Sequence, residues 1–145
     1  MEFTYRQKQV RYTFKVADSG EAQVSTPRMV FDMVKDNFNP IQETMLLLLC
    51  DVKNHIIDKI EVAKGGSNSL VITPREIFVH AIKQGARAIF IAHHHPSGDV
   101  QPSEEDIIFT RKVKKASDIL GIDLLDHLVY SSNDYYSFKQ HDLIK

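Results

Sequence analysis

A run of three histidines is followed by a serine and an aspartate, residue types that can bind a metal ion and act on its ligands: His93, His94, His95, Ser103 and Asp106. Side chains at alternate positions of an extended strand point the same way, so His93 and His95 can converge on one atom. Asp106 falls in the first turn of the next predicted helix, which can fold back over the strand end. Two neutral imidazoles, one carboxylate and a water molecule make up a catalytic zinc site. Zinc lowers the pKa of such a water from roughly 15.7 to about 7.

Each of these residues also fits an ordinary structural role. A His-x-His pair alone is weak evidence for a metal site. Ser103 and Asp106 can serve as the N-cap and as an acidic first-turn residue of the following helix, which does not exclude a function. The middle residue, His94, is predicted to face away from its neighbours and to be a support for the site or a surface residue, not a ligand. The pair Asp126-His127 is a candidate for such a support or for a capping role, and His127 is interpreted foremost as a structural histidine.

The rest of the sequence predicts the elements that hold these residues. We expect strands at residues 11–17, 44–50, 55–62, 87–92, 124–130 and 135–138, and helices at residues 26–37, 73–85 and 103–120. Thr-Pro pairs begin the first two helices, and Gly121 ends the third. In the strand at 55–62, alternation predicts a common face for four side chains: Ile56, Asp58, Ile60 and Val62. Strands alternating with helices indicate one α/β domain with helices packed on a central sheet.

The composition is that of an ordinary folded domain. The chain has 145 residues, of which 43% are hydrophobic and 26% are charged, and this excludes a disordered or collagen-like chain. Its net charge of -1 does not support binding to DNA or to an anionic membrane. The single cysteine, Cys50, cannot form an internal disulfide or a thiolate zinc cluster. With no apolar leader or membrane-length apolar run in the sequence, we expect a cytoplasmic protein with no membrane partner.

The histidine segment resembles a known motif. His93-x-His95, seven intervening residues, Ser103, two residues and Asp106 are similar to the JAMM motif of the JAB/MPN metallopeptidases. The flanking segments at 73–78, 93–99, 102–103 and 124–127 resemble the bacterial RadC family more narrowly, and the resemblance covers roughly residues 40–138. It implies a single three-layer α/β domain, a central mixed sheet flanked by helices, as in cytidine deaminases.

The resemblance also divides the chain. It implies a RadC-like JAB/MPN metallohydrolase domain at residues 40–145, with a strand–helix extension at residues 1–39 packed on it. We expect no counterpart in this sequence of the helix-hairpin-helix segment that often precedes the RadC domain, which removes the part most suggestive of DNA contact. RadC members usually have Asn where this chain has His94, so we expect different hydrogen bonding near the zinc.

Roles for individual residues follow from the resemblance. It implies that His93, His95 and Asp106 are zinc ligands. Ser103 matches the serine whose hydroxyl helps to stabilise the tetrahedral oxyanion. The family's general base is a glutamate on an upstream strand, and Glu43 matches that position. The residues alone would not select Glu43 over its rival Glu76, although a capping box already accounts for Glu76.

The resemblance therefore implies a zinc-dependent hydrolase of the JAMM type that cleaves peptide or isopeptide bonds in a peptide or protein substrate. Zincin proteases are excluded because they need His-Glu-x-x-His, and zinc nucleobase deaminases because they need Pro-Cys-x-x-Cys. A DNA-repair or DNA-associated factor and a non-catalytic binding module remain as alternatives. Four basic residues form either a solvated helix face or a nucleic-acid patch: Arg111, Lys112, Lys114 and Lys115.

Overall fold

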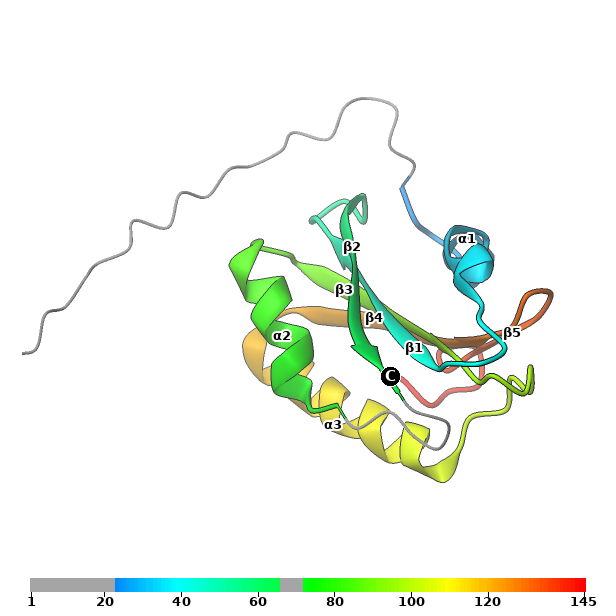
Figure 1. Cartoon of the computed structure of the whole chain (residues 1–145). Coiled ribbons are helices and arrows are strands. Elements are labelled where there is room, and N and C mark those ends of the chain that lie inside the picture. Colours follow the sequence, from blue (N-terminus) through cyan, green and yellow to red (C-terminus); the bar gives the residue numbers. More distant parts are fainter. Residues whose placement is uncertain (1–22, 66–71) are drawn as a thin grey trace, which may run out of the picture.

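A mixed sheet of five strands runs through the centre of the molecule, in a computed structural model that describes residues 23–65 and 72–145 (Figure 1). The strands are β1 (Thr44–Cys50), β2 (Ile56–Lys64), β3 (Ala88–His94), β4 (Asp123–Tyr130) and β5 (Tyr135–Ser137). Their order across the sheet is β2-β1-β3-β4-β5. β3 and β4 are parallel, and the other neighbouring pairs are antiparallel. A parallel pair needs a crossover connection, which the helix α3 (Glu104–Leu120) supplies.

Helices cover both faces of the sheet, which confirms the predicted three-layer α/β architecture (Figure 1). α2 (Pro74–Lys83) and α3 pack on one face, where Ile77 and Val113 enter the core. α1 (Pro27–Val34) packs on the other face through Val30 and is followed by a short 3-10 helix, Lys35–Asn37. The central strands β1 and β3 are buried along their whole length, and most of their side chains are apolar.

The helices begin and end at residues that the sequence marks. The side chain of Thr26 accepts a hydrogen bond from the backbone N–H of Met29 at 3.3 Å, at the start of α1. At the start of α2, Oε2 of Glu76 accepts from the backbone N–H of Thr73 at 2.5 Å, one half of a capping box. Gly121 ends α3 with a φ of +68°, a left-handed conformation that glycine adopts without steric cost.

Each helix and strand predicted within the described residues is present. The predicted strand at residues 11–17 lies outside the described residues, and the division of the chain between residues 39 and 40 stays a prediction. Within residues 23–65 and 72–145, no helix combines the length and the apolar character needed to cross a membrane.

At the start of β2, one side chain lies on the face of the sheet opposite to the one that alternation predicts. Alternation placed Ile56 with Ile60, but Ile56 packs in the core beneath α1, whereas Ile60 packs in the core beneath α2 and α3. The cause is a shift in the β1–β2 register between Leu49 and Cys50, which inserts one residue into β2. A bulge of this kind reverses the alternation of side chains on either side of it.

Removing a side chain from the centre of the sheet should destabilise the whole domain. Leu48 lies in β1 and is 0% exposed, so Leu48→Ala should lower the free energy of unfolding by about 2–5 kcal/mol through lost contacts and a cavity. Val52, 75% exposed in the turn after β1, is the control, and Val52→Ala should change it by less than about 0.5 kcal/mol. Urea denaturation measures both, and equal losses would contradict the central position of β1.

Candidate metal centre

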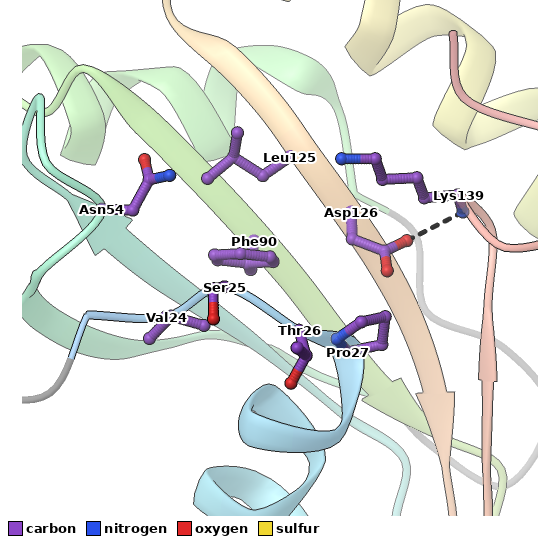
Figure 2. A pocket seen from close by; sticks show the side chains of 9 residues that line it. All are labelled: Val24, Ser25, Thr26, Pro27, Asn54, Phe90, Leu125, Asp126 and Lys139. Carbon is purple, nitrogen blue, oxygen red and sulfur yellow. Dashed lines mark hydrogen bonds between the residues drawn. The ribbon is translucent and has the colours of Figure 1, made fainter.

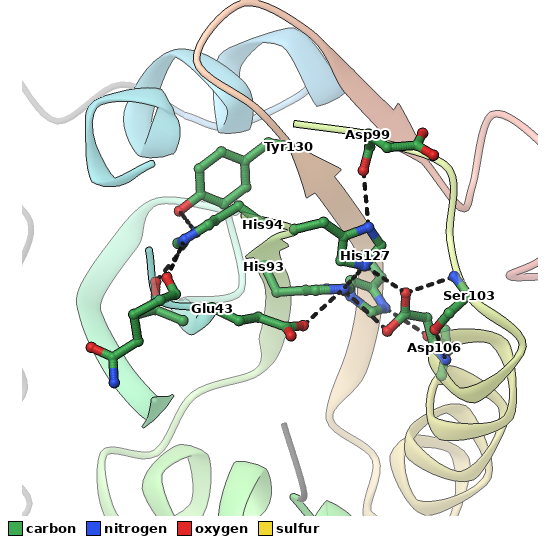
Figure 3. Close-up of polar contacts among 12 residues, drawn as sticks. Glu43, His93, His94, Asp99, Ser103, Asp106, His127 and Tyr130 are labelled. Carbon is green, nitrogen blue, oxygen red and sulfur yellow. Dashed lines mark hydrogen bonds and ion pairs between the residues drawn. The ribbon is translucent and has the colours of Figure 1, made fainter. Parts of the chain in front are cut away.

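Two histidines and a carboxylate meet where the end of β3 faces the first turn of α3 (Figure 3). His93 is the last but one residue of β3, and His95 follows the strand directly. The loop to α3 begins with a turn in which the N–H of Gly98 donates to the carbonyl of His95 at 2.9 Å. Gly98 has a φ of +81°, which only glycine adopts readily, so the chain can reverse here and return α3 to the strand end.

Asp106 contacts both histidines. Its Oδ1 lies 3.1 Å from Nε2 of His93, and its Oδ2 lies 3.0 Å from Nε2 of His95. The two Nε2 atoms are 3.2 Å apart. A tetrahedral ion with bonds of roughly 2.0–2.1 Å places its ligand atoms about 3.3 Å from one another. The three side chains therefore present their donor atoms at a spacing that suits a tetrahedral metal ion.

Glu43 reaches the cluster from the neighbouring strand. It directly precedes β1, in which Met45 pairs with His93, so the antiparallel register brings Glu43 to the end of β3. Its Oε1 lies 3.9 Å from Nε2 of His93. One ligand atom from each of four residues lies within 4.8 Å of the others: Glu43, His93, His95 and Asp106. This group could hold a metal ion, whereas the carboxylate of the rival Glu76 caps α2.

Hydrogen bonds hold each imidazole from its far side. Nδ1 of His95 lies 2.9 Å from the carbonyl oxygen of Asp99, to which it donates, so Nε2 is the metal-facing nitrogen. Nδ1 of His93 lies 2.6 Å from Nε2 of His127 in β4, and Nδ1 of His127 lies 2.6 Å from Oγ1 of Thr110 in α3. Thr110 is a mid-helix residue that nothing in its local sequence marks, so its position beside His127 could not be predicted from the sequence.

Ser103 and Asp106 also form the capping box of α3. The N–H of Asp106 donates to Oγ of Ser103 at 3.1 Å, and the N–H of Ser103 donates to Oδ2 of Asp106 at 2.8 Å. The capping interaction therefore holds the Asp106 carboxylate with one oxygen toward each histidine. Oγ of Ser103 is the acceptor in this contact, which leaves the hydroxyl proton available to donate. Capping and metal binding are compatible at these two residues.

His94 lies on the opposite face of the sheet from His93, as alternation predicts, but it is 0% exposed, so the surface alternative is wrong. Its Nε2 lies 2.7 Å from the carbonyl oxygen of Gln42, and its Nδ1 lies 3.3 Å from the hydroxyl of Tyr130 (Figure 3). Burial lowers the pKa of His94, which favours the neutral ring. His94 thus ties the residue before Glu43 to β3.

Burial and neighbouring charges shift the pKa values within the cluster. Burial alone would raise the pKa of Asp106, but hydrogen bonds from His93 and His95 hold it far below its usual range. The hydrogen bond to Asp106 raises the pKa of His95. Burial also raises the pKa of Glu43, and the nearby histidines offset this only in part. Asp106 is therefore ionised, as a metal ligand must be, while Glu43 binds a proton more readily than an exposed glutamate.

A separate pocket lies on the α1 side of the sheet (Figure 2). It is lined by Val24, Ser25, Thr26, Pro27, Asn54, Phe90, Leu125, Asp126 and Lys139. The carboxylate of Asp126 is buried there, and it already accepts hydrogen bonds from the hydroxyl of Ser137 and from the backbone N–H of Lys139. These bonds join β4 to β5 and to the segment that follows it, so they account for Asp126 in structural terms.

Most of the chain is similar to known proteins. The model of a RadC-like JAB domain matches residues 24–143. UPF0758 proteins of Clostridium perfringens, Aquifex aeolicus and Carboxydothermus hydrogenoformans are 42%, 38% and 50% identical over 132, 127 and 102 residues. The alignments cover 90%, 86% and 70% of this chain, but 58%, 55% and 45% of the relatives. The chain thus spans about half the length of the curated relatives that it matches.

Removal of any one donor should remove the metal. We expect His93→Ala, His95→Ala and Asp106→Ala each to lose tight zinc binding, because each leaves two ligands where a catalytic zinc site uses three. The matched control is His94→Asn, which changes the neighbouring ring on the opposite face and should keep the zinc. Mass spectrometry of the metal content of untagged protein measures this. Equal zinc loss in the His94 variant would mean that the ligand pair is misassigned.

Proposed function

The chain belongs to the family of RadC-like JAB-domain proteins, and on this premise we propose that it is a zinc-dependent hydrolase of peptide or isopeptide bonds. The observation that carries the proposal is the convergence of Glu43, His93, His95 and Asp106 within 4.8 Å. Two imidazoles and a carboxylate with room for a further ligand are the donor set of a catalytic zinc site, whereas structural zinc sites are closed by four protein ligands, mostly thiolates.

Zinc fits this donor set better than a harder cation. Magnesium and calcium prefer oxygen ligands, whereas imidazole nitrogen suits zinc. His93, His95 and Asp106 would hold the ion, and Glu43 Oε1, at 3.9 Å from Nε2 of His93, lies farther out. When bound, zinc would polarise a scissile carbonyl and make a water molecule more acidic.

Glu43 is proposed to be the general base. Its carboxylate takes a proton from the attacking water and passes it to the leaving amine. Burial raises the pKa of Glu43, which makes it a stronger base than an exposed glutamate. The contact between His94 and the carbonyl of Gln42, at 2.7 Å, supports this role because it restrains the backbone immediately before Glu43.

Ser103 is proposed to stabilise the oxyanion that forms when water adds to the scissile carbonyl. Its Oγ already accepts from the N–H of Asp106, so the hydroxyl proton can point toward the developing negative charge. The same contact restrains the hydroxyl beside the carboxylate ligand, and this reduces the reorganisation needed during the reaction.

Association with DNA is the alternative proposal. The net charge of -1 does not favour it, and Lys114 of the basic cluster on α3 pairs with Asp118 at 2.8 Å, as on a solvated helix face. Two results together would favour this alternative: an affinity for duplex DNA that falls steeply as salt is added, and no cleavage of any peptide. The presence of all the residues of the motif argues against a non-catalytic module.

Loss of the base should separate catalysis from metal binding. Glu43→Gln should keep its zinc and its melting temperature but lose hydrolysis, because an amide cannot take the proton of the attacking water. The probes are a pool of quenched fluorescent peptides and a pool of lysine-linked isopeptides, cleaved by the zinc-loaded wild type and compared with metal-free protein. Unchanged turnover in Glu43→Gln would assign the base elsewhere. Absence of cleavage in both pools at full zinc occupancy would contradict the hydrolase proposal.

Two substitutions separate the structural and catalytic roles of Ser103. Ser103→Ala should lower the free energy of unfolding by about 0.5–2 kcal/mol through loss of the N-cap, and should reduce turnover by about 10²–10³-fold with unchanged zinc content. Ser103→Asp restores the cap but places a carboxylate where negative charge develops, so it should fold and be inactive. A folded and fully active Ser103→Asp enzyme would contradict the oxyanion role.

A further inference from the structure

A row of buried polar groups connects the backbone of Asp106 with the far side of His93. Oγ1 of Thr110 lies 2.7 Å from the carbonyl oxygen of Asp106 and 2.6 Å from Nδ1 of His127. Nε2 of His127 lies 2.6 Å from Nδ1 of His93. Thr110 is 1% exposed, and both histidines are 0% exposed. Water cannot replace a missing partner at such depth, so each proton in the row needs an acceptor within it.

The single hydroxyl proton of Thr110 determines which group donates in each of these hydrogen bonds. A hydroxyl has one proton, and Thr110 donates it to the carbonyl of Asp106, so Oγ1 must accept from Nδ1–H of His127. Both ring nitrogens of His127 are then occupied by Thr110 and His93, and no carboxylate among residues 23–65 and 72–145 contacts either of them. The ring is also stacked on Phe138, with 4.5 Å between the centroids, an environment that favours the neutral form.

A neutral His127 with its proton on Nδ1 has a lone pair on Nε2. That lone pair must accept from Nδ1–H of His93, because the two nitrogens are 2.6 Å apart. A ring of His93 that keeps its proton on Nδ1 can offer the lone pair of Nε2 to a metal ion, in place of the hydrogen bond to Asp106 that Nε2 makes without metal, and Nε2 is the atom that faces Asp106 and His95. The reverse order would place the proton of His93 on Nε2, where a metal ion has to bind.

We propose that Thr110 and His127 are positioning residues that fix the tautomer of His93, so that its Nε2 is prepared for zinc. The proposal rests on the zinc site proposed above. The backbone carbonyl of Asp106 lies at one end of the row, and the carboxylate of the same residue contacts His93 at the other end. The proposed ligand on α3, Asp106, and the proposed ligand on β3, His93, are therefore linked through the buried interior. A metal-binding histidine held by a buried hydrogen bond at its other nitrogen binds metal more tightly.

The protonated nitrogen of His127 can be observed directly. Long-range ¹H–¹⁵N correlation spectra of the full chain should show the His127 proton on Nδ1, both without metal and with zinc, with the signals assigned by their loss in His127→Gln. A proton on Nε2 of His127 would overturn the proposal. The spectrum of the metal-free protein requires neither zinc nor activity. A failure of the proposal for Thr110 and His127 can therefore be distinguished from a failure of the hydrolase proposal.

Substitutions in the row should change zinc affinity through the hydroxyl. Thr110→Val keeps the side-chain shape but lacks the proton and the lone pairs, so it should raise the Kd for zinc by about 10–100-fold, whereas Thr110→Ser should stay close to wild type. The matched control is Ser117→Ala. Ser117 is another buried hydroxyl of α3, 1% exposed, but it accepts from the N–H of Leu124 outside the row. The control should lower the melting temperature and leave the Kd unchanged.

Two results would overturn the proposal. One is a Kd for zinc in Thr110→Val that equals that of wild type, and the other is a rise in this Kd that is equally large in Ser117→Ala. If Thr110→Val does not fold, a second pair of variants takes its place. The amide of His127→Gln can accept from His93 with its oxygen and donate to Thr110 with its nitrogen, whereas His127→Leu can do neither. Zinc should bind more tightly to the glutamine variant, and equal affinities would overturn the role of His127.

Discussion

The confinement of two carboxylates with two imidazoles is the constraint on which this structure depends. The side chains of Glu43 and Asp106 are only 15% and 16% exposed, and their ligand atoms lie within 4.8 Å of one another. Water screens their repulsion weakly at that depth. The histidines compensate by hydrogen bonding to Asp106, which keeps that carboxylate ionised. A cation bound among the four groups would balance the remaining charge, and the fold is arranged to keep them together.

Different levels of structure place the members of the cluster, and they differ in how well the sequence predicts them. Strand alternation separates His93 and His95 from His94, and a helix cap accounts for the placement of Ser103 and Asp106. Alternation and capping are both patterns of the local sequence, so these positions could be predicted. Glu43 depends on the pairing of β1 with β3, a contact between distant segments. Its residue type and neighbours do not distinguish it, and only the resemblance to a family singled it out.

The parts that could not be predicted have physical causes of the same kind. A bulge in β2 moved Ile56 to the other face, and alternation contains no signal for an inserted residue. His94 is buried because the segment before β1 covers it, with Phe38 at 5.3 Å between ring centroids. Thr110 acts through partners on α3 and β4, so its role is visible only after these elements pack. Tertiary contacts, unlike periodicity, leave little trace in a single sequence.

The measurement that tests the central claim most directly is an anomalous difference map, collected at the zinc absorption edge from crystals of the zinc-loaded full chain. A single strong peak among Nε2 of His93, Nε2 of His95 and the carboxylate of Asp106, with Glu43 beside it and outside bonding distance, is the expected result. A peak at another position, or crystals of zinc-treated protein without a peak among these residues, would contradict the account.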